Sequence, residues 1–210
     1  CMTHFSDTLA PRAPELPALL IPRLARRDER YSTGPYAWLT PGLSSSTAYV
    51  GLSPGLACVF DTPATAALTH QQVGMLGFSE HQAWKHAAAR LLRFAEERGP
   101  EEAFWVRDPS IALGGAPGSL PRGVEVQALG WTAAGWVTHP TTFDALHSHF
   151  TEVLRPEHEL LYYVADDNKL FVFDAPPRDV AGVVGWERLM RYSLGFPLLL
   201  CRPRKIRRFY

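Results

Sequence analysis

The chain has 210 residues, of which 46% are apolar and 20% are charged, as expected for a folded globular protein. The 21 basic and 21 acidic residues balance to a formal net charge of zero, which argues against the broad basic surface of a nucleic-acid-binding protein. No apolar run approaches the roughly 18 residues that a membrane-spanning helix needs. The 18 prolines and 16 glycines argue against a helical bundle and predict short elements joined by turns.

The N-terminal part is expected to begin with a loose arm over residues 1–15, which are polar and contain prolines. The apolar residues of 16–31 predict a short helix that is interrupted near Pro22. Two runs rich in β-branched and aromatic residues follow at 47–52 and 56–61. These runs predict a pair of strands.

Two helices that begin with capping boxes are predicted next. Thr69 is followed by Gln72, and Ser79 by Gln82, the spacing at which the two residues satisfy each other's main-chain N–H groups. Apolar residues then recur at helical spacing as far as Gly99, which predicts a long second helix that ends there.

The second half of the chain combines further strands and helices. We expect strands at 103–106 and 124–131 around a loop, a capped helix from Thr141 to Leu154, a strand hairpin over 160–174, a helix within 185–194 and a last strand at 196–201. Hairpins and separate helices without regular βαβ alternation predict an α+β fold, with helices packed on a mainly antiparallel sheet. Residues 16–210 fit a single domain.

One motif matches the nucleophile elbow of esterases, in which a serine lies at a sharp turn from a strand into a helix. Gly51-Leu52-Ser53-Pro54-Gly55 has its G-x-S-x-G pattern. However, Pro54 has no main-chain N–H to donate to a developing oxyanion, and losing one such donor costs on the order of 3 to 4 kcal/mol of transition-state stabilisation. Pro followed by Gly is also what a type II turn requires. We therefore predict a hairpin turn without a nucleophile.

The histidines and cysteines show no spacing that predicts a metal or another cofactor. His147 and His149 would share a face in a strand, but in the predicted helix they lie about 200° apart around the axis. Cys58 and Cys201 lie in apolar runs without a C-x-x-C spacing, and we expect reduced thiols in a cytoplasmic protein. An enzymatic alternative would assemble its site from scattered residues, such as His139, His149, Glu152 and Asp174.

Residues 68–87 resemble the helix-turn-helix of bacterial DNA-binding proteins, with a capped short helix, a Leu-Gly-Phe-Ser turn and a second helix. The second helix begins with Glu80, His81 and Gln82, and an acidic side chain there would repel a phosphate backbone. We favour an αα-corner in the core of a domain and keep a DNA-binding regulator as an alternative.

A longer segment, residues 59–92, contains a strand that ends in Asp61, a linker to Leu68-Thr69 and an alanine-rich helix opened by the Leu-Gly-Phe-Ser turn. In the order of these parts it resembles the YtpQ-like family of uncharacterised bacterial proteins. The resemblance covers 34 of the 210 residues. It implies a strand–helix arrangement rather than a DNA-binding motif, and it implies no catalytic residue.

The last nine residues form a strongly basic segment, whereas the other 201 residues hold 16 basic and 21 acidic groups. Its basic residues are Arg202, Arg204, Lys205, Arg207 and Arg208. They predict either an edge strand protected by charge, which we favour, or a contact site for an acidic partner or a nucleic-acid backbone. The sequence as a whole favours a non-enzymatic binding or assembly protein with a protein partner over catalysis, nucleic-acid binding or membrane insertion. It does not indicate an oligomeric state.

Overall fold

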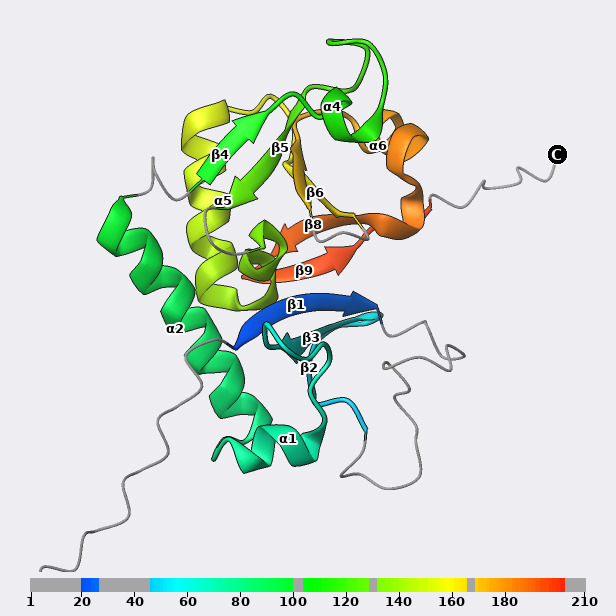
Figure 1. Cartoon of the computed structure of the whole chain (residues 1–210). Helices are drawn as coiled ribbons and strands as arrows, with labels where there is room; N and C mark the ends of the chain where they lie inside the picture. The colour runs from blue at the N-terminus through cyan, green and yellow to red at the C-terminus, as the bar shows by residue number, and fades with distance from the viewer. Residues whose placement is uncertain (1–19, 27–45, 100–103, 129–131, 166–168, 203–210) are drawn as a thin grey trace, which may run out of the picture.

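A computed structural model describes residues 20–26, 46–99, 104–128, 132–165 and 169–202. These residues form two antiparallel sheets, one of three strands and one of six, with helices packed against them (Figure 1). This arrangement confirms the predicted α+β class. The arm predicted at 1–15 lies outside the described residues. No described helix combines the length and the apolar composition that crossing a bilayer requires.

The three-stranded sheet contains β1 (Ile21–Arg26), β2 (Tyr49–Ser53) and β3 (Leu56–Asp61), in the order β1-β3-β2. β2 and β3 form the predicted hairpin, and β3 is buried from Leu56 to Phe60. The helix predicted at 16–31 is wrong within the described residues, because β1 pairs with β3 as a strand. Pro22 is tolerated there because β1 is an edge strand, whose open side needs no N–H donor.

Two helices, α1 (His70–Met75) and α2 (Glu80–Arg98), follow the three-stranded sheet. Both predicted capping boxes are present. The hydroxyl of Ser79 accepts the N–H of Gln82 at 3.3 Å, and the side-chain oxygen of Gln82 accepts the N–H of Ser79 at 2.9 Å. α2 is followed by Gly99 as its C-cap, as predicted.

The six-stranded sheet has the order β4-β5-β7-β6-β8-β9, and all of its neighbouring strands are antiparallel. Its strands are β4 (Phe104–Arg107), β5 (Gly123–Ala128), β6 (Leu161–Val164), β7 (Leu170–Phe173), β8 (Leu189–Ser193) and β9 (Phe196–Leu199). The strands predicted at 103–106, 124–131 and 196–201 and the hairpin over 160–174 are confirmed within these bounds, whereas residues 103 and 129–131 lie outside the described residues.

The helix predicted within 185–194 is wrong. That segment forms a short 3-10 helix, η2 (Trp186–Arg188), and then β8. Leu189 and Met190 are neighbours in sequence but are buried in different cores on opposite faces of the sheet, as successive residues of a strand are. The sequence prediction also missed α4 (Ser110–Leu113) and α6 (Pro177–Val184).

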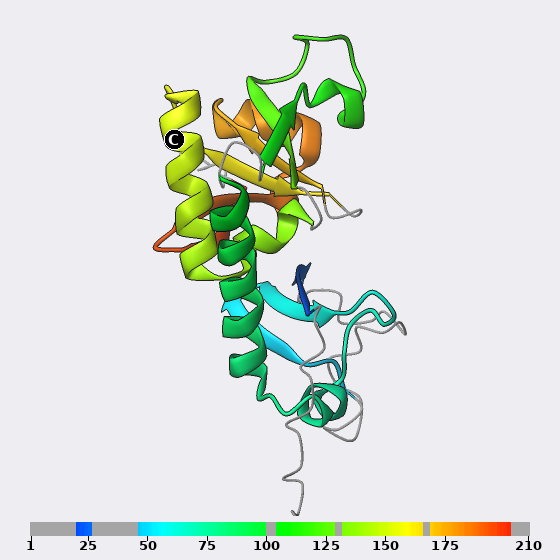
Figure 2. The same cartoon turned by 60° about the vertical axis from the view of Figure 1, so that its left-hand side comes forward.

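Different elements cover the two faces of the six-stranded sheet. The predicted helix at 141–154 is α5 (Pro140–Leu154). α5 and η1 (Ala133–Thr138) cover one face of the six-stranded sheet, and the larger core lies between this face and the three-stranded sheet. α2 runs from the three-stranded sheet to α5 (Figure 2). α6 covers part of the opposite face, over a second core that contains Phe171 and Phe173.

Candidate functional site

β4 is an open edge of the six-stranded sheet. It pairs with β5 on one side, and no described strand pairs with its other side. Trp105 is 57% exposed and Val106 is 54% exposed. Because successive side chains of a strand point to opposite faces, these two residues place apolar surface on both sides of the same edge. Main-chain N–H and C=O groups point outward along such an edge, where another strand can bond to them.

The two ends of β4 are firmly held. The ring of Phe104 packs against Trp136, with ring centroids 4.8 Å apart, and near Phe150, at 6.4 Å. At the other end Arg107 donates from Nε and Nη2 to the two carboxylate oxygens of Glu125, both at 2.7 Å. The side chain of Glu125 is fully buried, and its hydrogen bonds raise the pKa of Arg107. The exposed middle of β4 therefore lies between two fixed ends.

Exposed apolar side chains also occur in the two helices that neighbour β4 in the chain or in space. Ile111 of α4 is 63% exposed, but α4 lies across β5 from the free edge (Figure 1). The turn into α4 is fixed because a carboxylate oxygen of Asp108 accepts the N–H of Ser110 at 2.8 Å. Hydrogen bonds from the side chain of Ser110 and then from its N–H lower the pKa of Asp108. On the α5 side, Val153 is exposed and lies one helical turn beyond His149, whose ring packs beside β4. Apolar surface therefore continues from the edge towards α5.

The other described edge strands carry features that oppose further pairing. β1 contains Pro22 and β9 contains Pro197, and a proline has no N–H to give to an added strand. β2, the second edge of the three-stranded sheet, contains no proline, but its pairing with β3 is interrupted by a register shift between Gly51 and Ser53, and such a bulge also opposes the addition of a strand. The carbonyl of Pro197 also accepts the hydroxyl of Ser53 at 2.6 Å, which ties β9 to the end of β2. β4 contains no proline and its register with β5 runs without a shift, so it is the edge among the described strands that is best suited to accept another strand.

The structure places Ser53 in the predicted hairpin turn. Ser53 ends β2, Leu56 opens β3 and pairs with it, and Gly55 has the positive φ of 84° that the third position of a type II turn requires. A strand follows the serine, not the helix of a nucleophile elbow. The hydroxyl of Ser53 instead joins the two sheets through Pro197.

The histidines of α5 lie apart, as the helical prediction requires. His147 stacks on Tyr192, with ring centroids 4.1 Å apart, and its Nδ1 lies 2.7 Å from the hydroxyl of the buried Tyr162. His149 instead packs beside Phe104, at 5.9 Å between centroids. The described residues contain no group of three or more metal-ligating side chains placed to hold an ion.

The residues of the enzymatic alternative are not brought to one place. His139 caps α5 by accepting the N–H of Thr141 at 3.2 Å. Asp174 is buried after β7, where it accepts the N–H of His158 at 2.8 Å and forms an ion pair with Arg122 at 2.8 Å. His149 and Glu152 lie further along α5. The contacts of His139 and Asp174 therefore stabilise the local structure around each of these two residues.

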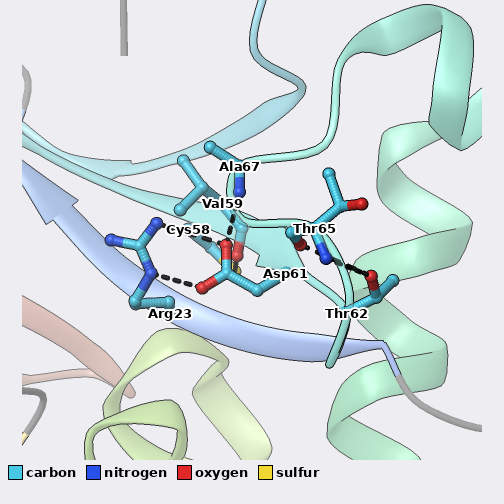
Figure 3. Close-up of polar contacts among 7 residues, drawn as sticks. All are labelled: Arg23, Cys58, Val59, Asp61, Thr62, Thr65 and Ala67. Atoms are coloured by element: carbon cyan, nitrogen blue, oxygen red, sulfur yellow. Dashed lines mark hydrogen bonds and ion pairs between the residues drawn. The ribbon is translucent and has the colours of Figure 1, made fainter. Parts of the chain in front are cut away.

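A second carboxylate cluster also holds the chain in place. Asp61 forms an ion pair with Arg23, at 2.5 Å from Nε, and its other oxygen accepts the N–H of Ala67 at 2.7 Å (Figure 3). The cluster thereby joins β1 to the segment that follows β3. Nearby, burial raises the pKa of the Cys58 thiol to about 12, so this cysteine stays protonated and unreactive at neutral pH.

The segment that resembles a helix-turn-helix packs into the core as an αα-corner. Ala83, Trp84 and Ala87, at the start of α2, are buried, and the indole N–H of Trp84 donates to the carbonyl of Thr138 at 2.6 Å. The first turn of α2 also carries Glu80, whose carboxylate contacts a histidine of α1. With Ala83, Trp84 and Ala87 in the core, the first turn of α2 carries an acidic residue where a DNA-binding helix needs basic ones to contact phosphate.

The basic segment at the C-terminus falls mostly outside the described residues. Arg202 is described and exposed. Arg204, Lys205, Arg207 and Arg208 lie outside the described residues, so the choice between an edge strand and a contact site stays a prediction.

Comparison with protein families, with curated proteins and with solved structures found no match to this chain. The resemblance of residues 59–92 to the YtpQ-like family therefore stays a prediction.

The sequence predicted β4 but not its exposure. Phe104-Trp105-Val106 is a run of three large apolar residues, which is typical of a strand buried on both faces. In the structure only Phe104 points into the core, because β4 lies at the edge. The short length of this run and the polar residues on both sides of it are the signal that could have indicated an edge strand.

Proposed function

We propose that this chain is a protein-binding module that accepts an extended segment of a partner along the free edge of β4. The observation that carries the proposal is the pair Trp105 and Val106, both more than half exposed on opposite faces of a proline-free edge strand. Large apolar residues exposed on an edge strand promote unwanted pairing, and proteins normally protect such edges. Here prolines protect β1 and β9 and a bulge interrupts β2, whereas β4 has neither feature.

The geometry of β4 supplies both parts of strand recognition. Outward main-chain groups would bond to the backbone of the partner and give affinity, while side chains on the two faces would select its alternate residues. Trp105 offers a large rigid surface that loses little conformational entropy on binding, as aromatic residues at the centre of interfaces do. The fixed ends, Phe104 and Arg107, keep the edge in one conformation before a partner arrives.

Synthetic strands provide a direct test. The probe is an acetylated seven-residue peptide with valine at alternate positions, threonine between them and a lysine at each end. Hydrogen exchange of the β4 amides, residues 104–107, is measured as the peptide is added. We expect protection with a dissociation constant on the order of 10–100 μM, because a four-residue edge buries less area than a standard interface.

Matched variants make the test specific. Val106→Lys should weaken peptide binding at least tenfold, since an edge lysine opposes pairing. Leu194→Lys is the control, because it replaces an apolar residue that is 88% exposed in the β8–β9 turn, at the other end of the sheet from β4. This variant should bind the peptide as the wild type does. A peptide with a central proline should not bind. Binding that is equal in both variants, or no protection at millimolar peptide, would overturn the proposal.

A further inference from the structure

We infer that the strand accepted by β4 is β4 of a second copy, so that two chains pair antiparallel about a two-fold axis that passes through Val106. This inference rests on the proposed function, because it names the partner of the same edge. The two six-stranded sheets would then form one continuous sheet across the dimer.

Symmetry limits the registers that two copies of β4 can adopt. A two-fold axis perpendicular to the sheet reverses the strand but keeps each face on its own side. Residues that lie opposite each other across the two strands must therefore have side chains on the same side of the sheet. Trp105 and Arg107 lie on one side of the sheet, and Phe104 and Val106 lie on the other. A register centred on Val106 satisfies this condition, pairs residues 105–107 of the two copies and places Phe104 opposite Asp108 of the other copy.

The Val106 register pairs complementary groups on the first face. Trp105 of each copy lies opposite Arg107 of the other. Arg107 bonds to Glu125 through Nε and Nη2, in the plane of its guanidinium group. The flat face of that group is available to stack on an indole, and arginine over tryptophan is the favoured cation–π pair. No pair of like charges lies opposite in this register.

The same register joins apolar groups on the second face. The two Val106 side chains meet at the axis, and β-branched side chains pack well across a strand pair. The half-buried side chain of Phe104 lies on the same face and packs beside His149 of α5, one helical turn before the exposed Val153. The dimer would therefore cover the apolar surface that the single chain leaves exposed around β4.

Sedimentation velocity of the full chain, from about 1 to 300 μM, tests the dimer. We expect a monomer–dimer equilibrium with a dissociation constant on the order of 10 μM, because the strand pair is short. Val106→Lys should shift the midpoint more than tenfold towards monomer, and Leu194→Lys should not shift it. Circular dichroism and the unfolding midpoint establish that each variant is folded. A dimer that is unchanged by Val106→Lys would overturn the inference.

Disulfide formation tests the register, in a background with Cys1 and Cys201 replaced by serine. Opposite residues of an antiparallel pair have Cα atoms about 4.5–5.5 Å apart, within the range that a disulfide needs. Val106→Cys should therefore form a covalent dimer on mild oxidation. Trp105→Cys should not, because the two diagonal positions are about 7–8 Å apart. Faster cross-linking at position 105 than at position 106 would overturn the register.

The outcome for the dimer is separable from that for the proposed function. If the peptide protects β4 but the chain stays monomeric to 300 μM and Val106→Cys gives no covalent dimer, the second copy is excluded and the strand-binding function stands. If neither the peptide nor a second chain binds at β4, both fail. A dimer that competes with the peptide for the edge supports both.

Discussion

Arg107 binds both carboxylate oxygens of Glu125, whose side chain has no exposed surface, across the β4–β5 pair. The two residues lie directly opposite each other in the register. A buried charge that loses its partner is far more costly than a buried pair of apolar residues of similar size. This ion pair therefore fixes the end of the candidate binding edge.

Arg107→Leu should lower the free energy of unfolding much more than an exposed charge change does, because it leaves the Glu125 carboxylate buried and unpaired. Arg107→Leu combined with Glu125→Leu should recover most of the loss. Urea unfolding at pH 7 measures both. Glu157→Gln is the control, because it removes an exposed ion pair in which Glu157 and Arg122 are 3.9 Å apart. It should change the free energy of unfolding only slightly. A double variant as unstable as the single one would contradict this explanation.

His147 should make the stability of the fold depend on pH. Burial lowers the pKa of His147, and the charges of Asp144 and Glu159 oppose this effect only in part. As the pH falls, His147 of the unfolded chain binds a proton near pH 6.5, whereas His147 of the folded chain binds it only at a lower pH. Lowering the pH therefore favours the unfolded chain. The stability associated with neutral His147 is present above about pH 6.5 and is lost as the pH falls below that value.

The measurement is the urea midpoint at pH 7.5 and pH 5.5 in the wild type and in His147→Gln. The variant should lose less stability between the two pH values. His86 and His139 also have a pKa lowered mainly by burial, so a smaller decrease should persist in the variant. An identical decrease in the two proteins would show that His147 does not contribute.

Cys58 and Cys201 should differ sharply in reactivity. Cys58 is buried with its pKa raised to about 12, whereas Cys201 is exposed. The thiolate is the reactive form, so iodoacetamide at pH 8 should label Cys201 and leave Cys58 unlabelled in the folded protein. Mass spectrometry of peptides after digestion reads out both sites, and the same reaction in urea should label both. Rapid labelling of Cys58 in the folded chain would contradict its burial.

Local signals in the sequence were sufficient for much of the fold. Pro54-Gly55 predicted the β2–β3 turn, and the pairs Thr69 with Gln72 and Ser79 with Gln82 predicted both helix starts, because each signal depends on main-chain geometry within a few residues.

The errors arose where long-range pairing decides the structure. Residues 21–26 and 189–193 form strands because β3, β6 and β9 pair with them, which no local periodicity shows. The candidate site was missed for the same reason. Trp105 and Val106 are exposed because of the position of β4 in the strand order, and that position is a property of the whole sheet.

The β8–β9 turn contains a residue that the local geometry disfavours, and replacing it should stabilise the fold. Leu194 has φ of 50° and Gly195 has φ of 83°, the two positive values of a type I′ hairpin turn. A left-handed conformation costs a leucine roughly 1–2 kcal/mol, whereas asparagine tolerates it. The leucine is also 88% exposed, so it contributes little burial in return.

Leu194→Asn should therefore raise the free energy of unfolding by roughly 0.5–1 kcal/mol in urea titrations. Gly195→Ala is the opposite control, because a Cβ there would lie 2.8 Å from Pro140 in addition to requiring a positive φ. It should destabilise the fold. If Leu194→Asn were instead destabilising, the exposed leucine would have to make a stabilising contact, and the assignment of this turn as a strained loop tip would be wrong.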